Sequence, residues 1–227
     1  MLSANQPSGA SAVDCIHCGV SNPPGATACQ RCGAGLRPIR KSAGFKRLLL
    51  KSVIRIVGLT FVLLFLGYAS LITTSDPILP NQEKQVYSAI DVLEGRGFKR
   101  EAFVLRRLVR YRATDNWWNR YVGHESAYAA TNFPFEVVTL YPQFFSEPTD
   151  DVERAAILLH ESYHLFGHGE ARAFECGWRD RQQLGWVRDL YNFTKVWMSV
   201  KEATQRWAPQ LFKCGEDGRS DCTESDR

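Results

Sequence analysis

Residues 150–177 read DDVERAAILLHESYHLFGHGEARAFECG, and this stretch decides the fold that the sequence predicts for the larger part of the chain. Asp150, followed three residues later by Glu153, is typical of a helix start. The apolar residues that recur at helical spacing behind this start are Val152, Ala156, Leu159 and Tyr163. A glycine turn follows at Gly167, and a second helical stretch begins at Glu170. The sequence therefore predicts two consecutive helices joined by a short turn.

The first of these helices carries the pattern HExxH, with His160, Glu161 and His164 as its fixed residues. Four residues make a little over one helical turn, so both imidazoles project from the same face and are able to bind one zinc ion. Glu161 would then reach a zinc-bound water and act as the general base of a peptidase. The alternative is that both histidines are ordinary surface or core residues.

A catalytic zinc ion needs a third protein ligand and keeps its fourth position open. Glu170, which stands six residues after His164 and opens the second helix, is the first choice for this ligand. His168 would be the ligand instead if the first helix ran straight on. Glu175 lies further along the second helix and is more typical of a solvated or supporting carboxylate. The sequence thus predicts Glu170 as the third ligand, with two competitors.

Three groups of zincins share features with residues 137–177. The run HESYHLFGHGE resembles the metzincin pattern HExxHxxGxxH or HExxHxxGxxD, with Glu170 in the last position. The run Glu170-Ala-Arg-Ala173 is similar to the ExxA run that supplies the glutamate ligand of many gluzincins. A strand, Phe144-Phe145 and a helix with HExxH are similar to deuterolysin-like aspzincins. The resemblance implies a zincin-like metallopeptidase domain and leaves the group within the zincins open.

The N-terminal part of the chain carries a second metal-binding pattern. Cys15-Ile-His-Cys18 and Cys29-Gln-Arg-Cys32 form two CxxC pairs separated by ten residues, and each pair directs two thiolates at one tetrahedral ion. Four cysteines leave no position open for catalysis, so the site is a closed one. His17 inside the first pair is therefore expected to be exposed. Two disulfides are the alternative, which a reducing cytoplasm disfavours.

The stretch around these cysteines also has a family resemblance. Residues 15–36, CIHCGVSNPPGATACQRCGAGL, resemble the short zinc ribbon found at the N-terminus of many bacterial membrane proteins. The resemblance implies a structural zinc ion and a recognition surface for a cytoplasmic protein. Together with the predicted catalytic ion, the chain would hold two zinc ions, one structural and one catalytic.

Residues 56–75, IVGLTFVLLFLGYASLITTS, contain no charged side chain. At a rise of 1.5 Å per residue they extend over about 30 Å, the thickness of the hydrocarbon core of a bilayer, which predicts one transmembrane helix. A cleaved signal peptide would lie at the extreme N-terminus, whereas about fifty residues precede this stretch. A buried helix of a soluble protein is the other alternative, and few such helices are apolar on all sides.

Basic residues are concentrated before this apolar stretch. The first 55 residues hold eight basic residues and one acidic residue, whereas the rest of the chain holds 20 and 23. Seven basic residues flank the predicted span: Arg37, Arg40, Lys41, Lys46, Arg47, Lys51 and Arg55. By the positive-inside rule, the N-terminus is predicted to be cytoplasmic in a bacterial inner membrane, with the C-terminal domain outside. Anionic lipid headgroups are the expected partners of the basic segment, and nucleic acid is not expected.

The remaining C-terminal sequence predicts three further helical stretches and one strand. Residues 81–94 and 100–112 carry apolar side chains at helical spacing and are separated by a Gly-Arg-Gly turn. Residues 135–141, FEVVTLY, are rich in β-branched and aromatic side chains, which is typical of a short strand. Residues 190–212 predict a helix that packs on the two helices of the HExxH site.

Three cysteines lie late in the chain. Cys214 and Cys222 are able to pair across the tail in an oxidising compartment, which leaves Cys176 single. The tail after Lys213 is polar and is expected to be loosely packed. The predicted organisation is a flexible N-terminus (1–14), a zinc ribbon (15–36), a basic juxtamembrane segment (37–55), a transmembrane helix (56–75), a zincin-like domain (77–212) and a polar tail (213–227).

Together these features predict a mainly helical fold with a small β element. An α+β zincin-like domain would be joined through one transmembrane helix to a zinc ribbon. The predicted function is a membrane-anchored zinc metallopeptidase that cleaves peptides or proteins outside the cytoplasm, with Glu161 as its general base. The alternative is a non-catalytic sensor or scaffold, in which the zincin fold keeps zinc for stability alone and the ribbon recruits a cytoplasmic protein or nucleic acid. Glu161 favours the enzyme, because a structural site needs no base beside its ligands.

Overall fold

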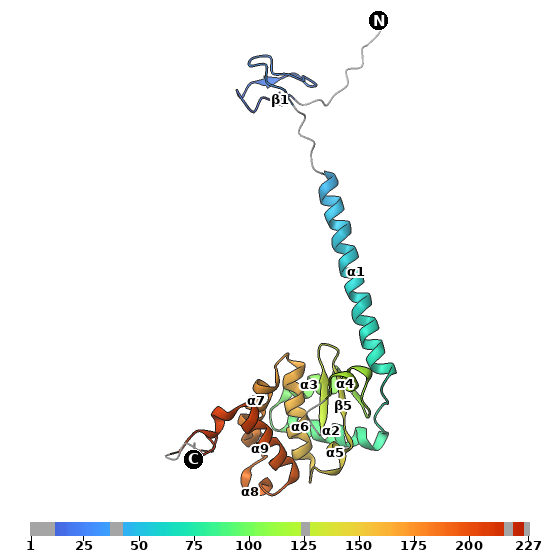
Figure 1. Cartoon of the computed structure of the whole chain (residues 1–227), viewed down its shortest axis with the longest axis vertical. Coiled ribbons are helices and arrows are strands. Elements are labelled where there is room, and N and C mark those ends of the chain that lie inside the picture. The colour runs from blue at the N-terminus through green and yellow to red at the C-terminus, as the bar shows by residue number, and fades with distance from the viewer. Residues whose placement is uncertain (1–11, 37–42, 124–127, 216–219, 225–227) are drawn as a thin grey trace. The chain divides into compact units, whose positions relative to one another are not determined.

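The computed structural model describes residues 12–36, 43–123, 128–215 and 220–224, and the side chains of its first helix from residue 48 onward. The chain divides into two compact units, Met1–Thr60 and Phe61–Arg227 (Figure 1). Helices predominate in the described part, and the sheets are small, which confirms the mainly helical fold with a small β element. Residues 1–11 of the flexible N-terminus predicted over 1–14, and the basic residues at 37–42, lie outside the described residues.

The N-terminal unit is built around its cysteines. Strand β1 (Val13–Asp14) pairs antiparallel with strand β2 (Ser21–Asn22). The chain turns back after each CxxC pair at Gly19 and Gly33, whose φ angles of 71° and 72° lie in the left-handed region that glycine adopts without steric cost. The buried residues of this unit are Cys15, Cys29 and Leu36, with Asn22 beside them. Val13 and Asp14, which the sequence assigns to a flexible N-terminus, form β1 because they pair with β2.

Helix α1 (Ala43–Thr73) contains the apolar stretch. Among the described helices it holds the one segment, Leu48–Thr73, that is long and apolar enough to cross a membrane. This segment begins earlier than the predicted span of 56–75 and includes Lys51 and Arg55. The helix extends upstream because leucine, lysine and arginine are good helix formers, and long basic side chains near the end of a span reach the headgroups while their stems stay in apolar surroundings.

The C-terminal unit combines a sheet of three described strands with a group of helices (Figure 1). Strand β5 (Val137–Leu140) is central, with β3 (Arg110–Arg112) parallel on one side and β4 (Ala129–Asn132) antiparallel on the other. The strand predicted at 135–141 is confirmed as β5, and all its residues are buried. The sequence does not predict β4, because Ala-Ala-Thr-Asn has little β-propensity and forms a strand only through its pairing with β5.

Two helices precede the sheet, α2 (Pro80–Gly95) and α3 (Lys99–Arg107). Helix α2 confirms the first predicted helix after the span and buries one apolar face. The prediction of a helix over 100–112 is wrong in its second half, because α3 ends at Arg107 and β3 follows. Apolar and basic residues alternate at the end of this segment, which suits an extended strand, and the pairing with β5 favours it over the helix.

The short helix α4 (Trp117–Val122) is fixed against strand β4. Asn116 caps the helix by accepting hydrogen bonds from the backbone amides of Trp118 and Asn119, both at 3.0 Å. The side-chain amide of Asn116 also donates to Asn132 Oδ1 of β4 at 2.7 Å. Because Asn116 is fully buried, this bond holds α4 in one position beside the sheet.

Helix α6 (Asp151–Leu165) carries the HExxH residues, and the short helix α5 (Pro142–Ser146) precedes it. The helix starts as predicted: Asp150 accepts hydrogen bonds from the backbone amides of Val152 and Glu153, both at 3.0 Å. The second predicted helix is confirmed as α7 (Glu170–Leu184), which packs against α6. The two helices and the turn between them form the frame of the site.

The helix predicted over 190–212 is divided in the structure. Its parts are α8 (Arg188–Tyr191), α9 (Lys195–Trp207) and the 3₁₀-helix η1 (Pro209–Phe212). The division follows from local chemistry, because Thr194 caps α9 by accepting from the Trp197 amide at 3.2 Å, and Pro209 has no amide hydrogen with which to continue a helix. Helix α9 packs against α7, in agreement with the predicted packing on the site helices.

Aromatic rings and one buried carboxylate join these helices. The rings of Trp178, Trp186, Trp197 and Phe212 pack against one another. Glu153 of α6 is fully buried and accepts hydrogen bonds from the Thr149 amide at 2.8 Å and from Thr194 Oγ1 at 2.5 Å. This carboxylate therefore connects the start of α6 to the cap of α9 through charge-assisted hydrogen bonds.

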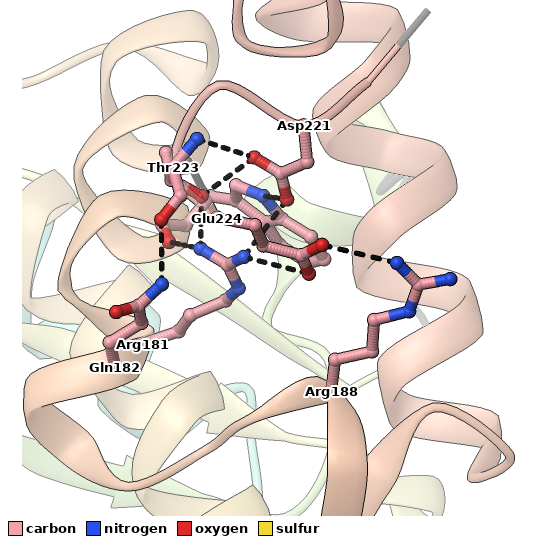
Figure 2. Close-up of polar contacts among 7 residues, drawn as sticks. Arg181, Gln182, Arg188, Asp221, Thr223 and Glu224 are labelled. Atoms are coloured by element: carbon pink, nitrogen blue, oxygen red, sulfur yellow. Dashed lines mark hydrogen bonds and ion pairs between the residues drawn. The ribbon is translucent and has the colours of Figure 1, made fainter. Parts of the chain in front are cut away.

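The end of the chain packs on α7. A disulfide joins Cys214 to Cys222, which confirms the predicted pairing and leaves Cys176 free. Asp221, inside the loop that this disulfide closes, and Thr223 and Glu224, which follow it, cover Arg181 of α7, as Figure 2 shows. The expectation of a loosely packed tail is therefore wrong for residues 220–224.

Arg181 is the centre of this contact and is only 1% exposed. Its Nη2 donates to Asp221 Oδ2 at 2.9 Å and to Glu224 Oε1 at 3.3 Å, and its Nη1 donates to Thr223 Oγ1 (Figure 2). Trp178 Nε1 also donates to Asp221, at 2.8 Å. Burial lowers the pKa of Arg181, and the two carboxylates oppose this effect. A buried guanidinium needs such partners, which explains why a polar tail is held in place.

Candidate metal centres

The four cysteines of the N-terminal unit surround one point. The Sγ atoms of Cys15 and Cys32 lie 3.6 Å apart, and those of Cys18 and Cys29 lie 3.5 Å apart. All four lie within 4.8 Å of one another, and none of them is in a disulfide. Zinc with Zn–S bonds of about 2.3 Å requires sulfur atoms about 3.8 Å apart, so the cluster fits one metal ion. His17 is exposed and stands outside the cluster, as expected.

The thiols of this cluster differ in how readily they ionise. The backbone amides of Cys32 and Arg31 favour the thiolate of Cys29 and lower the pKa of that thiol to about 6. The Val20 amide favours the Cys18 thiolate, but burial and the neighbouring cysteines outweigh it and raise the pKa of Cys18 to about 12. The Cys29 thiolate therefore forms more readily than the Cys18 thiolate, and a divalent cation at the centre would favour the thiolate of a cysteine that binds it.

Asn22 is a buried residue of the N-terminal unit that the CxxC pattern does not identify. Its side-chain amide donates to the Val20 carbonyl at 2.8 Å and contacts Cys29 Sγ at 3.7 Å. Its Oδ1 accepts from the Gln30 amide at 2.9 Å. Asn22 therefore ties the two CxxC turns together and directs a donor at one sulfur atom, which is how outer residues orient metal ligands.

The C-terminal unit brings the predicted zinc ligands together. The Nε2 atoms of His160 and His164 lie 3.1 Å apart. Glu170 places one carboxylate oxygen 3.5 Å from His160 Nε2 and the other 3.4 Å from His164 Nε2. Ligand atoms about 2.1 Å from a tetrahedral zinc ion lie about 3.4 Å from one another, so this donor set fits zinc. Helix α6 supplies both imidazoles from one face, and the first turn of α7 supplies the carboxylate.

The two imidazoles are oriented in different ways. His164 Nδ1 lies 2.9 Å from the backbone oxygen of His168, which leaves Nε2 as the nitrogen that faces the site. The ring of His160 packs on Phe174, with 4.2 Å between ring centroids, and its Nδ1 has no hydrogen-bond partner among the described residues. A hydrogen bond therefore fixes one ring, and packing fixes the other.

The charges around the imidazoles favour a cation. Burial of the His164 ring opposes its protonation, but the hydrogen bond with Glu170 and the charges of Glu161 and Glu170 outweigh burial and raise the pKa of His164 to about 9. Hydrogen bonds from His160 and His164 hold the pKa of Glu170 well below its usual range. Two carboxylates beside two imidazoles give this part of the structure a negative potential, which stabilises a bound cation.

Glu161 lies beside the ligand group without belonging to it. The residue is only 2% exposed, and its Oε2 accepts a hydrogen bond from Thr131 Oγ1 of β4 at 2.6 Å. The sequence does not identify Thr131, because the strand that carries it has no recognisable pattern. Strand β4 thus orients a carboxylate that α6 places next to the first imidazole.

Neither competitor for the third ligand position contributes its side chain to the ligand group found among the described residues. Glu175 pairs with Arg172 at 3.0 Å and with Arg179 at 3.2 Å. The backbone oxygen of His168 contacts His164 Nδ1, the nitrogen that does not face the site, and the His168 ring lies outside the ligand group. The geometry therefore favours Glu170.

The ligand group opens into a cleft of about 430 Å³, lined by residues of α4, β4 and the turn between α6 and α7. A smaller cavity of about 150 Å³ lies beside it, between α6, α7 and α9. The apolar side chains that line this cavity are Ala156, Ile157, Phe174, Val200, Ala203 and Trp207. A potential metal centre thus lies between an open cleft and an apolar cavity, an arrangement typical of small-molecule and peptide sites.

Comparisons with known proteins give no relative from which a function could be transferred. No protein-family model matches the chain, and no curated protein or solved structure matches it either.

Proposed function

We propose that the C-terminal unit is a zinc metallopeptidase anchored to a membrane by α1. The observation that supports this most is the position of Glu161, a buried carboxylate that Thr131 holds next to three potential zinc ligands. Burying a charge that binds no metal destabilises a fold, so a purely structural zinc site gains nothing from it. A hydrolase needs such a group as its base.

The roles of the site residues follow from their geometry. His160, His164 and Glu170 would hold the ion, and three protein ligands with an open fourth position are typical of catalytic zinc. Bound zinc supplies Lewis-acid chemistry, which polarises a peptide carbonyl and lowers the pKa of water. Glu161 would accept the proton of the attacking water on its oxygen that does not face Thr131, and would then pass this proton to the leaving amine.

The surroundings of the ligands suit a peptide substrate. Strand β4 is an edge strand of the described sheet and forms one wall of the cleft. An extended peptide is able to lie along this wall. The apolar cavity between α6, α7 and α9 would then receive an apolar side chain next to the cleaved bond.

The states of the cysteines support the proposed orientation. The four N-terminal cysteines are free, whereas Cys214 and Cys222 form a disulfide. Free thiols are typical of the reducing cytoplasm, and disulfides are typical of oxidising compartments. Together with the basic residues before the apolar segment, this difference favours a cytoplasmic N-terminal unit and a C-terminal unit on the other side of the membrane.

The alternative function is a non-catalytic sensor or scaffold that works through the N-terminal unit. Ile16, in the first CxxC turn, is 85% exposed, and an exposed apolar side chain on a rigid turn is able to contact a protein partner. In this alternative the cysteine cluster recruits a cytoplasmic protein, and zinc in the C-terminal unit only stabilises the fold.

The test compares Glu161→Gln with the wild type by zinc analysis and by cleavage of a peptide library. We expect zinc to stay bound, because Glu161 is not a ligand, and turnover to fall by at least about 10²-fold. Glu175→Gln is the matched control, since it removes a nearby carboxylate whose ion pairs among the described residues are with Arg172 and Arg179, and it should retain both zinc and turnover. Wild-type turnover by Glu161→Gln would reject the peptidase and favour the scaffold.

A further inference from the structure

A patch of exposed apolar side chains lies on α4 and on the turn after β4. The members of this aromatic patch are Trp117, Trp118, Tyr121, Val122 and Phe133, and each is exposed. The ring centroids of Trp117 and Trp118 are 5.5 Å apart, and those of Trp118 and Tyr121 are 6.0 Å apart. Contiguous apolar surface of this kind marks a binding surface rather than a chance exposure.

The aromatic patch is joined to the C-terminal end of α1. Trp117 Nε1 donates to Ser70 Oγ at 3.0 Å, and the Trp117 backbone amide donates to Thr74 Oγ1 at 3.2 Å. Arg120 donates to the backbone oxygen of Thr74 at 3.0 Å. Three hydrogen bonds thus fix α4 to the end of the apolar helix, so the patch cannot move independently of it.

These contacts set the height of the aromatic patch along α1. Ser70 precedes Thr73, where the apolar segment ends, by about 4.5 Å along the helix axis. Gly67 lies closer to the middle of the apolar segment, about 9 Å from the same end. The Phe135 ring packs against α1 at this glycine, since a Cβ atom added there would lie only 3.0 Å from the ring. Where α1 crosses a bilayer, rings at this height lie between hydrocarbon and headgroups, the region in which Trp and Tyr are enriched.

The aromatic patch also borders the metal cleft. Trp118, Val122 and Phe133 line the cleft that contains the ligand group. Trp118 and Phe133 line, in addition, a groove against Leu71 of α1. The same side chains therefore separate the cleft from the membrane-crossing helix, and a substrate that enters the cleft on this side passes over them.

We propose that the aromatic patch inserts into the interface of the bilayer that α1 crosses, so that the metal cleft opens at the membrane surface. This inference rests on the proposed membrane anchor and peptidase, and it narrows the substrates to polypeptide segments within a few residues of the membrane. Arg120, held at the end of α1, provides a positive charge at the height of the lipid phosphates. A soluble partner would not explain why α4 is fixed to α1 at this height.

Tyr121 and Phe193 offer matched positions for a test. Both are exposed aromatic residues, at 80% and 72%. Tyr121 belongs to the patch on α4, whereas Phe193 comes two residues after the end of α8, a helix that lies at the other end of the C-terminal unit from α4 (Figure 1). The full chain with Tyr121→Trp or Phe193→Trp is reconstituted in vesicles with phospholipids brominated near the headgroup end of their acyl chains. We expect at least about twofold quenching of the emission that Tyr121→Trp adds, and none for Phe193→Trp. Equal quenching at both positions, or none at either, overturns the docking.

Cleavage tests the substrate class separately. One peptide is presented either free or with a lipid anchor next to its cleaved segment, and Tyr121→Ser is compared with Phe193→Ser. Tyr121→Ser should lower cleavage of the anchored peptide by about fivefold and leave the free peptide unchanged, because one ring no longer enters the interface. Equal loss for both peptides, or a wild-type preference for the free one, contradicts the substrate class. If the wild type cleaves neither, the peptidase proposal fails, and quenching still decides the docking.

Discussion

The cysteine cluster of the N-terminal unit and the group of His160, His164 and Glu170 both gather their donor atoms within 4.8 Å, yet different structures support them. The cysteines are themselves the main part of their unit's small core. The imidazoles and the carboxylate stand at the edge of an extensive hydrophobic core and face an open cleft. We therefore expect the first region to need a metal ion in order to fold, and the second to fold without one and bind it afterwards. The size of the hydrophobic core that supports the ligands therefore distinguishes a structural site from a catalytic one, in addition to the ligands themselves.

Cys29→Ser should have the largest effect on stability, because it removes a ligand of the ion on which the N-terminal unit depends. Structural zinc in small modules contributes about 10 kcal/mol or more of apparent binding free energy, and three buried residues cannot replace it. We expect loss of one zinc ion per chain and rapid proteolysis within residues 12–36, with the second zinc ion unaffected. His17→Ala is the control and should retain both ions. Continued protease resistance without zinc would show that this unit folds through its own contacts.

Asp221→Ala should have a smaller effect and should act on the C-terminal unit alone. The substitution leaves the Arg181 guanidinium buried with one of its two carboxylate partners removed, which destabilises this unit by about 3 kcal/mol in chemical denaturation. Arg188→Ala removes an exposed ion pair with Glu224 and should cost less than about 1 kcal/mol. Equal losses for the two variants would mean that the buried contact does not hold α7, the helix that carries Glu170.

The sequence predicts the ligand groups because their signals are local. The spacing of two CxxC pairs, and of two histidines four residues apart on a helix, places the donors without knowledge of the rest of the fold. The start of α6 is equally local, since Asp150 binds the amides of the next turn. Glu170 could be predicted as the third ligand because only a short turn separates it from His164, so the start of α7 stays close to the imidazoles.

Other features depend on contacts between distant parts of the chain, and the sequence does not reveal them. Thr131 reaches Glu161 only because β4 pairs with β5, and nothing in Ala-Ala-Thr-Asn marks a strand. Residues 110–112 are a strand for the same reason. The neighbours of Arg181 in the sequence are typical of a solvated helix. Arg181 is buried because the tail folds over it, and this contact between distant residues cannot be predicted from the sequence.

We propose that the chain holds one zinc ion bound by sulfur and another bound by nitrogen and oxygen. X-ray absorption at the zinc edge, on the full chain with Cys15, Cys18, Cys29 and Cys32 replaced by serine, isolates the second ion. We expect a shell of nitrogen and oxygen atoms at about 2.0–2.1 Å and no sulfur. A sulfur atom at about 2.3 Å would contradict this proposal, because Cys176 of α7 would then be a ligand of the ion assigned to His160, His164 and Glu170.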